Sequence, residues 1–317
     1  ISEACSYLNL PSISKKQASL SVNKFLQRKL LRQNKIFTPK FETFDSVTSA
    51  MQLVKKFNSP IVIKPVDSSG SRGVRYFDDF SEINANYLIK TLNLSKSNLG
   101  IIESFVEGQE LAVDGFIIGG DFKIISICEK TRTQPPFLLD TELKFPADLN
   151  DSSINIIKKF VKKVVKATKI LNSPIHMEII NSPKGPVLVE FGARGAGFNV
   201  FDTILPFVSG IDTIQLQVSM ALGENLNIKK VQNKAAILSF VSTNYDGTLQ
   251  EIPDCNKILS IPSIKYCQFF VKKGDKVKML KSGDERLGYI LSLSNNLEDC
   301  EKSIIKAKEL IKIKLKT

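Results

Sequence analysis

Two short apolar runs, residues 175–180 (IHMEII) and 187–197 (VLVEFGARGAG), each carry a single carboxylate, Glu178 and Glu190. The residues between them (NSPKGP) are rich in turn formers, so the two runs are predicted to be neighbouring antiparallel strands. Carboxylates on adjacent buried strands repel each other unless a divalent cation or a positive ligand lies between them. The second run then delivers Arg194 in a glycine-rich turn, which suits an anionic substrate. Carboxylates for a cation and a guanidinium for phosphate together suggest nucleotide chemistry.

A lysine stands near the end of another apolar run, earlier in the chain. Residues 60–66 (PIVIKPV) are predicted to form a strand that carries Lys64, and the loop 67–73 (DSSGSRG) follows. An ammonium group there can bind phosphate oxygens, and small loop residues let backbone N–H groups approach the same phosphates. Taken alone, an ordinary hairpin with a surface lysine explains these residues better. The chain has no GxxxxGK[ST], which excludes a P-loop NTPase, and no GxGxxG opening a helix, which disfavours a dinucleotide-binding fold.

Length and composition bound the elements that must position these residues. The chain has 317 residues, 43% of them apolar, so we expect two or three domains with a large core. No apolar run approaches the roughly 20 residues that cross a bilayer, and residues 1–12 do not resemble a signal peptide. They look like the middle of a longer protein. Five scattered cysteines without a CxxC argue against a disulfide framework or a zinc site, so the cytoplasm is the expected location.

The formal net charge of +12 raises the alternative of nucleic-acid binding. Lysine is spread along the whole chain, however, and Trp is absent, so basic and aromatic residues do not interleave. The charge fits attraction for an anionic small molecule such as ATP equally well. We therefore expect neither a specific nucleic acid nor a membrane as a partner.

Hydrophobic periodicity predicts a mixture of helices and strands. The helix expected at 19–36 would bury Val22, Leu26 and Leu30, and those beginning near Asp45 and Asp212 would use these aspartates as N-caps. Residues 131–148 are predicted to form a long irregular loop. The expected helices span 19–36, 45–57, 81–94, 153–171, 211–223 and 298–313. The expected strands span 60–66, 74–77, 100–108, 110–118, 122–130, 175–180, 187–197, 235–243, 265–274 and 286–294.

The order of these features resembles the ATP-grasp superfamily, in particular its carboxylate–amine ligase and carbamoyl-phosphate-synthase-like branch. The lysine strand and its loop come first, residues 102–110 (IESFVEGQE) follow, and the carboxylate strands with Arg194 come later. The resemblance covers roughly residues 20–225, and the closing part is similar to the C-terminal piece of amino-acid ligases. It implies an α+β fold in which two subdomains grip the nucleotide, with a small C-terminal α+β lobe. The implied divisions are a helical connector from a missing N-terminal domain (1–38), a lid subdomain (39–106), a core subdomain with the metal site (107–230) and the lobe (231–317).

The resemblance also implies roles for individual residues. The expected catalytic residues are Lys64 and Arg194, and the expected metal ligands are Glu178 and Glu190. Phosphate binding is implied for Lys24, Lys64, Ser69, Gly70, Ser71 and Gly73. Recognition of adenine is implied for the hinge residues Glu103, Ser104, Phe105 and Val106, and recognition of the ribose for Glu110.

One departure from the family pattern leaves the metal site open. The family often has Asn two residues after the second glutamate as a further ligand, and this chain has Gly192 there. The second cation would then be held by Glu190 and phosphates alone, or by Asn199. The implied cofactors are ATP and one or two Mg²⁺ ions, for which Mn²⁺ could substitute.

We therefore expect an ATP-dependent ligase that joins a small carboxylate to an amine through an acyl phosphate, with a homodimer as the common assembly in such proteins. Two alternatives stay open: a nucleotide-binding module without its own catalysis, and a carbamoyl-phosphate-synthase-like or acid–thiol ligase. His176, the only histidine, is expected to be structural, because a lone strand histidine usually is and no GxSxG partners it. Lys130 could equally contact substrate or lie in an exposed basic loop.

Overall fold

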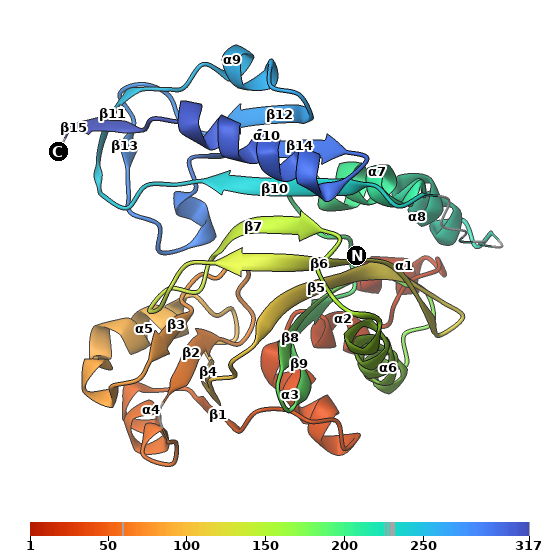
Figure 1. Ribbon diagram of the computed structural model, residues 1–317. Coiled ribbons are helices and arrows are strands. Elements are labelled where there is room, and N and C mark those ends of the chain that lie inside the picture. The colour runs from red at the N-terminus through yellow and green to blue at the C-terminus, as the bar shows by residue number, and fades with distance from the viewer. Residues whose placement is uncertain (59, 225, 227, 229–231, 317) are drawn as a thin grey trace.

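Figure 1 shows the computed structural model, which describes residues 1–58, 60–224, 226, 228 and 232–316. The helical elements are α1 (Ser2–Tyr7), α2 (Lys15–Leu20), α3 (Lys24–Gln33), α4 (Val47–Val54), η1 (Phe80–Glu82), α5 (Ala85–Asn93), α6 (Asp151–Thr168), η2 (Val200–Ile204), α7 (Leu205–Ser209), α8 (Thr213–Ala221), α9 (Cys255–Leu259), η3 (Gly283–Glu285) and α10 (Leu297–Leu310). The strands are β1 (Phe41–Phe44), β2 (Ile61–Pro65), β3 (Arg75–Phe77), β4 (Gly100–Ser104), β5 (Gln109–Ile118), β6 (Asp121–Arg132), β7 (Asp140–Phe145), β8 (Ser173–Ser182), β9 (Gly185–Gly192), β10 (Ala235–Val241), β11 (Gly247–Glu251), β12 (Ile264–Phe269), β13 (Lys276–Val277), β14 (Gly288–Ser294) and β15 (Lys314–Lys316). These strands form three sheets.

The first sheet is antiparallel, with the strand order β1-β4-β2-β3. Because side chains alternate across a strand, β2 presents Ile61 and Ile63 to one face and Val62 and Lys64 to the other. Ile61 and Ile63 pack with residues of α4 and α5 in one hydrophobic cluster. Val62 and Lys64 line a cavity on the opposite face. The helices therefore fix the sheet so that its polar face points into the molecule.

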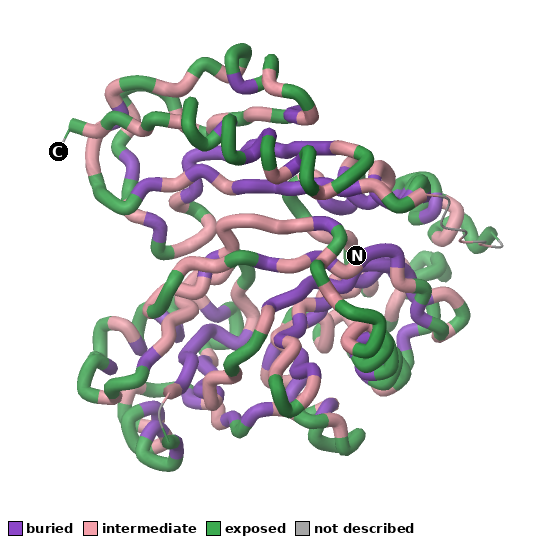
Figure 2. Tube along the Cα trace, in the orientation of Figure 1, coloured by how far each residue is buried: buried purple, intermediate pink, exposed green. Residues whose placement is uncertain are grey.

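The second sheet has eight strands in the order β12-β14-β10-β7-β6-β5-β8-β9. Strand β5 is buried along most of its length and divides its side chains between two environments. Leu111 and Val113 pack with the apolar side of α6, whereas Glu110, Ala112 and Asp114 line the cavity. In Figure 2 this strand and β8 are largely purple, at the centre of the molecule. The cavity thus lies between the polar faces of the two larger sheets.

The C-terminal strands continue this sheet. Strands β10, β14 and β12 follow β7 directly, and α10 packs on them through Ile304 against Ile237 and Ile290. Figure 1 shows these strands above β7, with the small sheet β13-β11-β15 beside them. The expected division at 230 and 231 falls outside the described residues, so the domain boundaries stay a prediction.

The N-terminal helical region differs from its prediction. The single helix expected at 19–36 is two helices, α2 and α3, and Asn23 caps α3 by accepting from the N–H of Leu26 at 3.0 Å. The predicted stripe is wrong, because Val22 is 61% exposed. The buried side of α3 is polar and carries Lys24, Gln27 and Arg28 beside Leu31. An apolar stripe could not reveal a helix whose buried face is charged.

Two further predictions are corrected. Residues 131–148 are not a continuous loop, because β7 forms within them and pairs with both β6 and β10. Asp45 is not the N-cap of α4: Ser46 is, and its hydroxyl accepts from the N–H of Ser49 at 3.2 Å. Asp212 caps α8 as predicted, accepting from the N–H of Gln215 at 2.9 Å.

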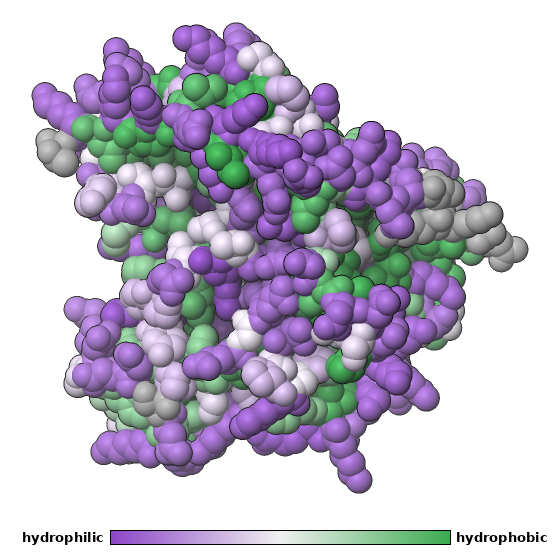
Figure 3. Space-filling model, in the orientation of Figure 1, coloured by the Kyte–Doolittle hydropathy of each residue, from purple (hydrophilic) through white to green (hydrophobic). Residues whose placement is uncertain are grey.

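Lysines form the outer face of α6. Lys158, Lys159, Lys162, Lys163 and Lys166 are all exposed, whereas the apolar side of this helix is buried. Hydrophilic side chains also cover most of the face of the molecule seen in Figure 3. The excess positive charge is therefore carried largely by solvated side chains.

Candidate active site

The two predicted carboxylate strands are β8 and β9, and they pair antiparallel as expected. Glu178 and Glu190 are direct partners in the register, beside a bulge at which Val189 of β9 has no partner on β8. Residues opposite each other in an antiparallel pair project from the same face of the sheet. The side chains of Glu178 and Glu190 are 21% and 30% exposed, and both line the cavity.

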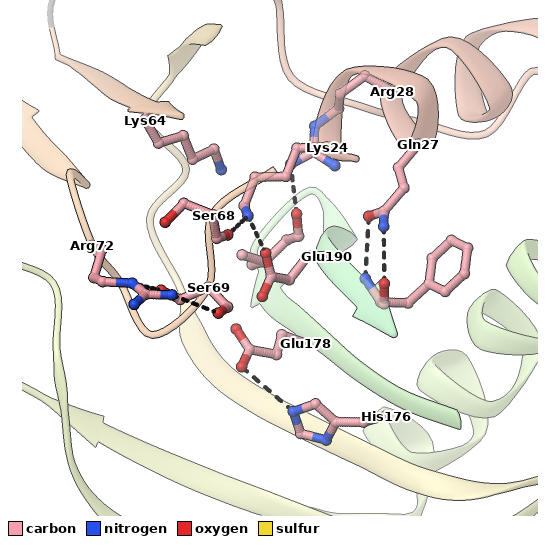
Figure 4. Close-up of polar contacts among 12 residues, drawn as sticks. Lys24, Gln27, Arg28, Lys64, Ser68, Ser69, Arg72, His176, Glu178 and Glu190 are labelled. Carbon is pink, nitrogen blue, oxygen red and sulfur yellow. Dashed lines mark hydrogen bonds and ion pairs between the residues drawn. The ribbon is translucent and has the colours of Figure 1, made fainter. Parts of the chain in front are cut away.

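Each of these carboxylates already has a lysine partner. Lys24 Nζ lies 2.5 Å from Glu190 Oε2, and Lys130 Nζ lies 3.0 Å from Glu178 Oε1. His176 Nε2 lies 3.5 Å from the same oxygen of Glu178. The sequence led us to expect a cation or positive ligand between the two carboxylates. Two lysines already relieve part of the repulsion between them. Figure 4 shows both carboxylates in one region of the site, with Lys24 and His176 against them.

Lys130 is the centre of a buried charge cluster. Its ammonium lies 3.2 Å from Glu110, 3.0 Å from Asp140 and 3.0 Å from Glu178, and Arg132 forms a further ion pair with Glu110. Burial lowers the pKa of Lys130, but the three carboxylates together raise it well above its usual range. Burial raises the pKa of Glu178, yet Lys130 and His176 hold that pKa well below its usual range. At Glu110 the effect of burial outweighs the attraction of Lys130 and Arg132, so the pKa of Glu110 is raised.

The lone histidine completes this cluster. His176 Nδ1 lies 2.8 Å from Asp114 Oδ1. Burial disfavours a charged imidazole, but Asp114 and Glu178 raise the pKa of His176 to about 10. The ring therefore adds positive charge beside Glu178 and has the hydrogen-bonded character expected of a structural histidine.

Lys64 belongs to a second buried cluster. Its Nζ lies 2.5 Å from Glu103 Oε2, and Arg28 Nε lies 2.5 Å from Glu103 Oε1. Arg28 also donates to the carbonyl of Val189 on β9 at 2.8 Å, so it ties the two larger sheets together. Burial lowers the pKa of Lys64, and Glu103 opposes that effect. The carboxylate of Glu103, expected to recognise adenine, is engaged with these two cations.

The loop 67–73 closes one side of the cavity. Lys24 Nζ donates to the carbonyl of Ser68 at 2.8 Å, so one lysine joins this loop to Glu190. Gly70 has a φ of +66°, which favours glycine, and nothing lies within 4 Å of the place that a Cβ would occupy. Figure 4 shows Ser69 and Arg72 at this loop, across from Glu178. The loop therefore carries backbone groups above the paired carboxylates.

Arg194 follows the end of β9 and is exposed in the cavity, where its Nη1 donates to the carbonyl of Gly195 at 2.7 Å. A Cβ on Gly195 would lie 2.3 Å from the ring of Phe201, so this turn needs glycine for close approach. Asn199, the alternative ligand in place of Gly192, has its side-chain oxygen bonded by the Tyr289 hydroxyl at 3.0 Å. That contact favours Glu190 and phosphates over Asn199 as ligands.

Apart from Gly73 and the alternative ligand Asn199, the predicted site residues line a single cavity of about 380 Å³. Gly73 instead packs against Pro65 and Leu94. Sequence reasoning missed the roles of Arg28 and Asp140 and left Lys130 undecided. Arg28 follows Lys24 by four residues, so helical spacing places the two on one face and could have revealed it.

The donor set suits a hard cation. Among the described residues, no group of three or more His, Cys, Asp or Glu side chains could hold a metal ion. Magnesium keeps several waters and is commonly bound through one or two carboxylates plus phosphate oxygens. Glu178 and Glu190 are two such carboxylates on one face of the sheet.

Two family descriptions match the sequence: "ATP-grasp domain" at residues 57–202 and "L-amino acid ligase C-terminal domain 2" at residues 239–316. The crystal structure of L-amino acid ligase from Bacillus licheniformis is similar over 100% of this chain and 78% of that chain, with a TM-score of 0.87 and 26% identity. Residues 57–202 therefore form an ATP-grasp domain. The fold and the resemblance predicted from the sequence are thereby confirmed.

Two more comparisons define how far the likeness reaches. An uncharacterized protein of Sinorhizobium fredii is 26% identical over 98% of this chain, which spans 65% of that protein's length. The 2-oxoglutarate carboxylase biotin carboxylase domain of Hydrogenobacter thermophilus, solved with MgADP, has a TM-score of 0.70 over 99% of this chain and 72% of that chain. At 15% identity this last likeness shows the fold alone. No helix among the described residues is long and apolar enough to cross a bilayer.

Proposed function

We propose that the chain is an ATP-dependent carboxylate–amine ligase of the amino-acid-ligase type. The observation that carries the proposal is the single cavity that gathers Lys24, Lys64, Glu178, Glu190 and Arg194. A carboxylate is a poor electrophile, and a cavity with these charges can hold ATP beside it for phosphorylation. The match to the L-amino acid ligase C-terminal domain 2 supports an amino acid as a substrate.

The phosphates of ATP would lie between the two larger sheets. Lys24, Lys64 and the backbone N–H groups of residues 69–71 would bind them. Glu178 and Glu190 would hold Mg²⁺ or Mn²⁺, and the cation supplies charge neutralisation of the phosphates when bound. Fixed positive groups that meet the developing charge of a transferring phosphoryl group lower the barrier to its transfer.

The adenine would lie against the hinge residues 104–106. The N–H groups of Ser104 and Phe105 already donate to the carbonyls of Lys40 and Pro60, both at 3.0 Å. Contacts to the base would therefore fall to Val106 and to the hinge carbonyls. Glu110 would accept from the ribose, although its Oε1 already contacts Lys130 and its Oε2 already contacts Arg132.

The proposed reaction has two steps. An oxygen of the substrate carboxylate attacks the γ-phosphorus and ADP departs, leaving an acyl phosphate. The amine then attacks the acyl carbon, the C–N bond forms, and phosphate departs with the oxygen that came from the carboxylate. Arg194, exposed in the cavity, would neutralise the acyl phosphate, and the loop 67–73 would shield it from water.

The test is release of ADP and phosphate from MgATP across pairwise mixtures of the common amino acids, with each product identified by mass spectrometry. We expect turnover that requires both an amino acid and a divalent cation. Binding of MgADP in a calorimetric titration without turnover on any pair would reject the ligase and support a nucleotide-binding module.

A further inference from the structure

A buried arginine of the C-terminal region lines the same cavity as Arg194. This residue, Arg286, lies between η3 and β14 and is 9% exposed. None of the roles described above uses it. Its position nevertheless makes the C-terminal region a wall of the proposed active site.

Aromatic rings and one backbone contact hold the guanidinium in place. Its Cζ lies 3.6 Å from the ring centroid of Phe240 and 5.1 Å from that of Phe198. Its Nη2 donates to the carbonyl of Asp140 at 2.8 Å. Stacking on a ring fixes the plane of a guanidinium while its in-plane N–H groups stay able to donate.

Neighbouring groups satisfy only some of the hydrogen-bond donors of Arg286 and only part of its positive charge. Its Nε is buried and has no hydrogen-bond partner among the described residues. Burial lowers the pKa of Arg286, and Asp140 only partly opposes this, since its carboxylate is 3.0 Å from Lys130. A buried cationic donor without a partner is costly, and an anionic ligand in the cavity would relieve that cost.

The surroundings of Arg286 fit an anion attached to a hydrocarbon. Leu138, Leu143, Phe198 and Phe240 line the cavity together with Arg286. A carboxylate oxygen could reach the guanidinium while the carbon atoms of the same molecule contact these apolar side chains. A free amino acid has this combination of groups.

The segment that carries Arg286 also contacts the phosphate loop. The N–H of Gly283 donates to the carbonyl of Gly70 at 3.0 Å, and Arg72 Nη1 lies 3.8 Å from Asp284 Oδ2. Arg286 is therefore fixed close to the loop that would cover the phosphates. A ligand held by Arg286 would lie beside the place where the acyl phosphate forms.

We propose that Arg286 binds the carboxylate of the amine substrate and so selects an amino acid as the nucleophile. This inference rests on the proposed ligase function and assigns one residue to its second step. The amino nitrogen attacks the acyl carbon, the bond from that carbon to the phosphate oxygen breaks, and the proton lost from nitrogen leaves with the phosphate. The nucleophile's own carboxylate stays on Arg286 throughout.

The guanidinium could instead bind the transferred phosphoryl group, because both ligands present anionic oxygens. Three nucleophiles distinguish these two possible ligands of Arg286: an amino acid that the wild-type protein accepts, the amide of that amino acid, and hydroxylamine. Hydroxylamine traps the acyl phosphate as a hydroxamate and has no carboxylate. The variants are Arg286→Met and Arg286→Lys, with Lys281→Met as the matched control on an exposed lysine of the same segment.

We expect the wild-type protein and Lys281→Met to prefer the amino acid over its amide by about ten- to a hundredfold in kcat/KM, the range for a lost charge-assisted hydrogen bond. Arg286→Met should reduce this preference to about twofold or less, with Arg286→Lys between. The ratio of ligation to hydroxamate formation should fall at least about tenfold in Arg286→Met. Because each ratio is taken within one protein sample, partial loss of folded protein does not change it.

Three results would overturn the inference. A wild-type protein that uses the amide as well as the amino acid needs no carboxylate receptor. An Arg286→Met protein that keeps the preference does not bind the carboxylate through this residue. Equal losses of hydroxamate and ligation would place the guanidinium on the phosphoryl group. If the wild-type protein forms no hydroxamate with any common amino acid, the proposed function itself fails, and the inference fails with it.

Discussion

Replacing Glu103 by Gln should destabilise the protein strongly. The carboxylate is 4% exposed and neutralises two buried cations, Lys64 at 2.5 Å and Arg28 at 2.5 Å. Arg28 and Lys64 are 1% and 6% exposed, so neither can gain water without rearrangement. The substitution keeps the shape of the side chain and removes only its charge.

The magnitude follows from two routes. Breaking a buried ion pair by removing one partner costs about 3–5 kcal/mol, because an uncompensated charge is left behind. Independently, burial alone would raise the pKa of Glu103, but Arg28 and Lys64 lower it from 4.5 to about 2. At 1.36 kcal/mol per pKa unit, that shift is worth about 3 kcal/mol. We therefore expect the free energy of unfolding at pH 7 to fall by about 3–5 kcal/mol.

The pH dependence has a defined sign. The folded-state pKa of Glu103 lies below its unfolded value. The contribution of the ionised carboxylate to the free energy of unfolding is therefore fully present above pH 4.5 and is lost as the pH falls toward 2. The difference in stability between wild type and Glu103→Gln should shrink over that window. Urea denaturation followed by circular dichroism at pH 7, 5 and 3 measures it.

Glu42→Gln on β1 is the matched control, because the Glu42 side chain is 38% exposed and its Lys56 partner lies 4.0 Å away. We expect a change below about 0.5 kcal/mol for this variant. If Glu103→Gln proved as mild as Glu42→Gln, the claim that Glu103 binds two buried cations would be refuted.

Further predictions concern the metal ligands, the charge cluster and the Arg194 turn. Glu190→Gln should weaken MgADP binding by about tenfold or more while changing the affinity for metal-free ADP less, as measured by calorimetric titration; equal losses would contradict the metal assignment. Lys130→Met should lower the free energy of unfolding by about 3–5 kcal/mol because three carboxylates lose their shared cation, whereas Lys123→Met, at a surface ion pair, should change it by less than about 1 kcal/mol. Gly195→Ala should reduce turnover sharply because a Cβ would lie 2.3 Å from a phenyl ring, and Gly197→Ala, with nothing within 4 Å of its Cβ, should not; similar rates in the two variants would remove the steric argument.

Features with a local signal could be predicted from the sequence. Apolar runs separated by turn formers gave the pairing of β8 with β9 and the direct opposition of Glu178 and Glu190. The same kind of signal predicted the strands at 110–118 and 122–130, which are β5 and β6 and pair antiparallel. Direct opposition in the antiparallel register places both carboxylates on one face of the sheet.

Features that depend on distant charges could not be predicted this way. Lys130 pairs with Glu110, Asp140 and Glu178, which lie on three other strands. The buried face of helix α3 could not be identified from an apolar stripe, because that face is charged. Strand β7 has no apolar run of its own and is buried by neighbouring strands on both sides, so its sequence alone predicts a loop.

Arg286 is another cavity residue that local sequence could not identify. It follows Asp140 by well over a hundred residues, and only the folding of the C-terminal strands onto β7 brings the two into contact. Nothing local to residues 281–287 distinguishes it from an exposed arginine. Assembly of the continuous eight-stranded sheet is therefore the step that creates this part of the cavity.

The most direct measurement of the central claim follows an oxygen atom through the reaction. An accepted amino acid labelled with ¹⁸O in its carboxyl group is incubated with MgATP and its partner amino acid, and the released phosphate and nucleotide are weighed by mass spectrometry. We expect one ¹⁸O atom in the phosphate, with unlabelled ADP as the nucleotide product. Label in AMP, or unlabelled phosphate formed alongside the ligated product, would contradict an acyl phosphate held between the paired carboxylates, Lys64 and Arg194.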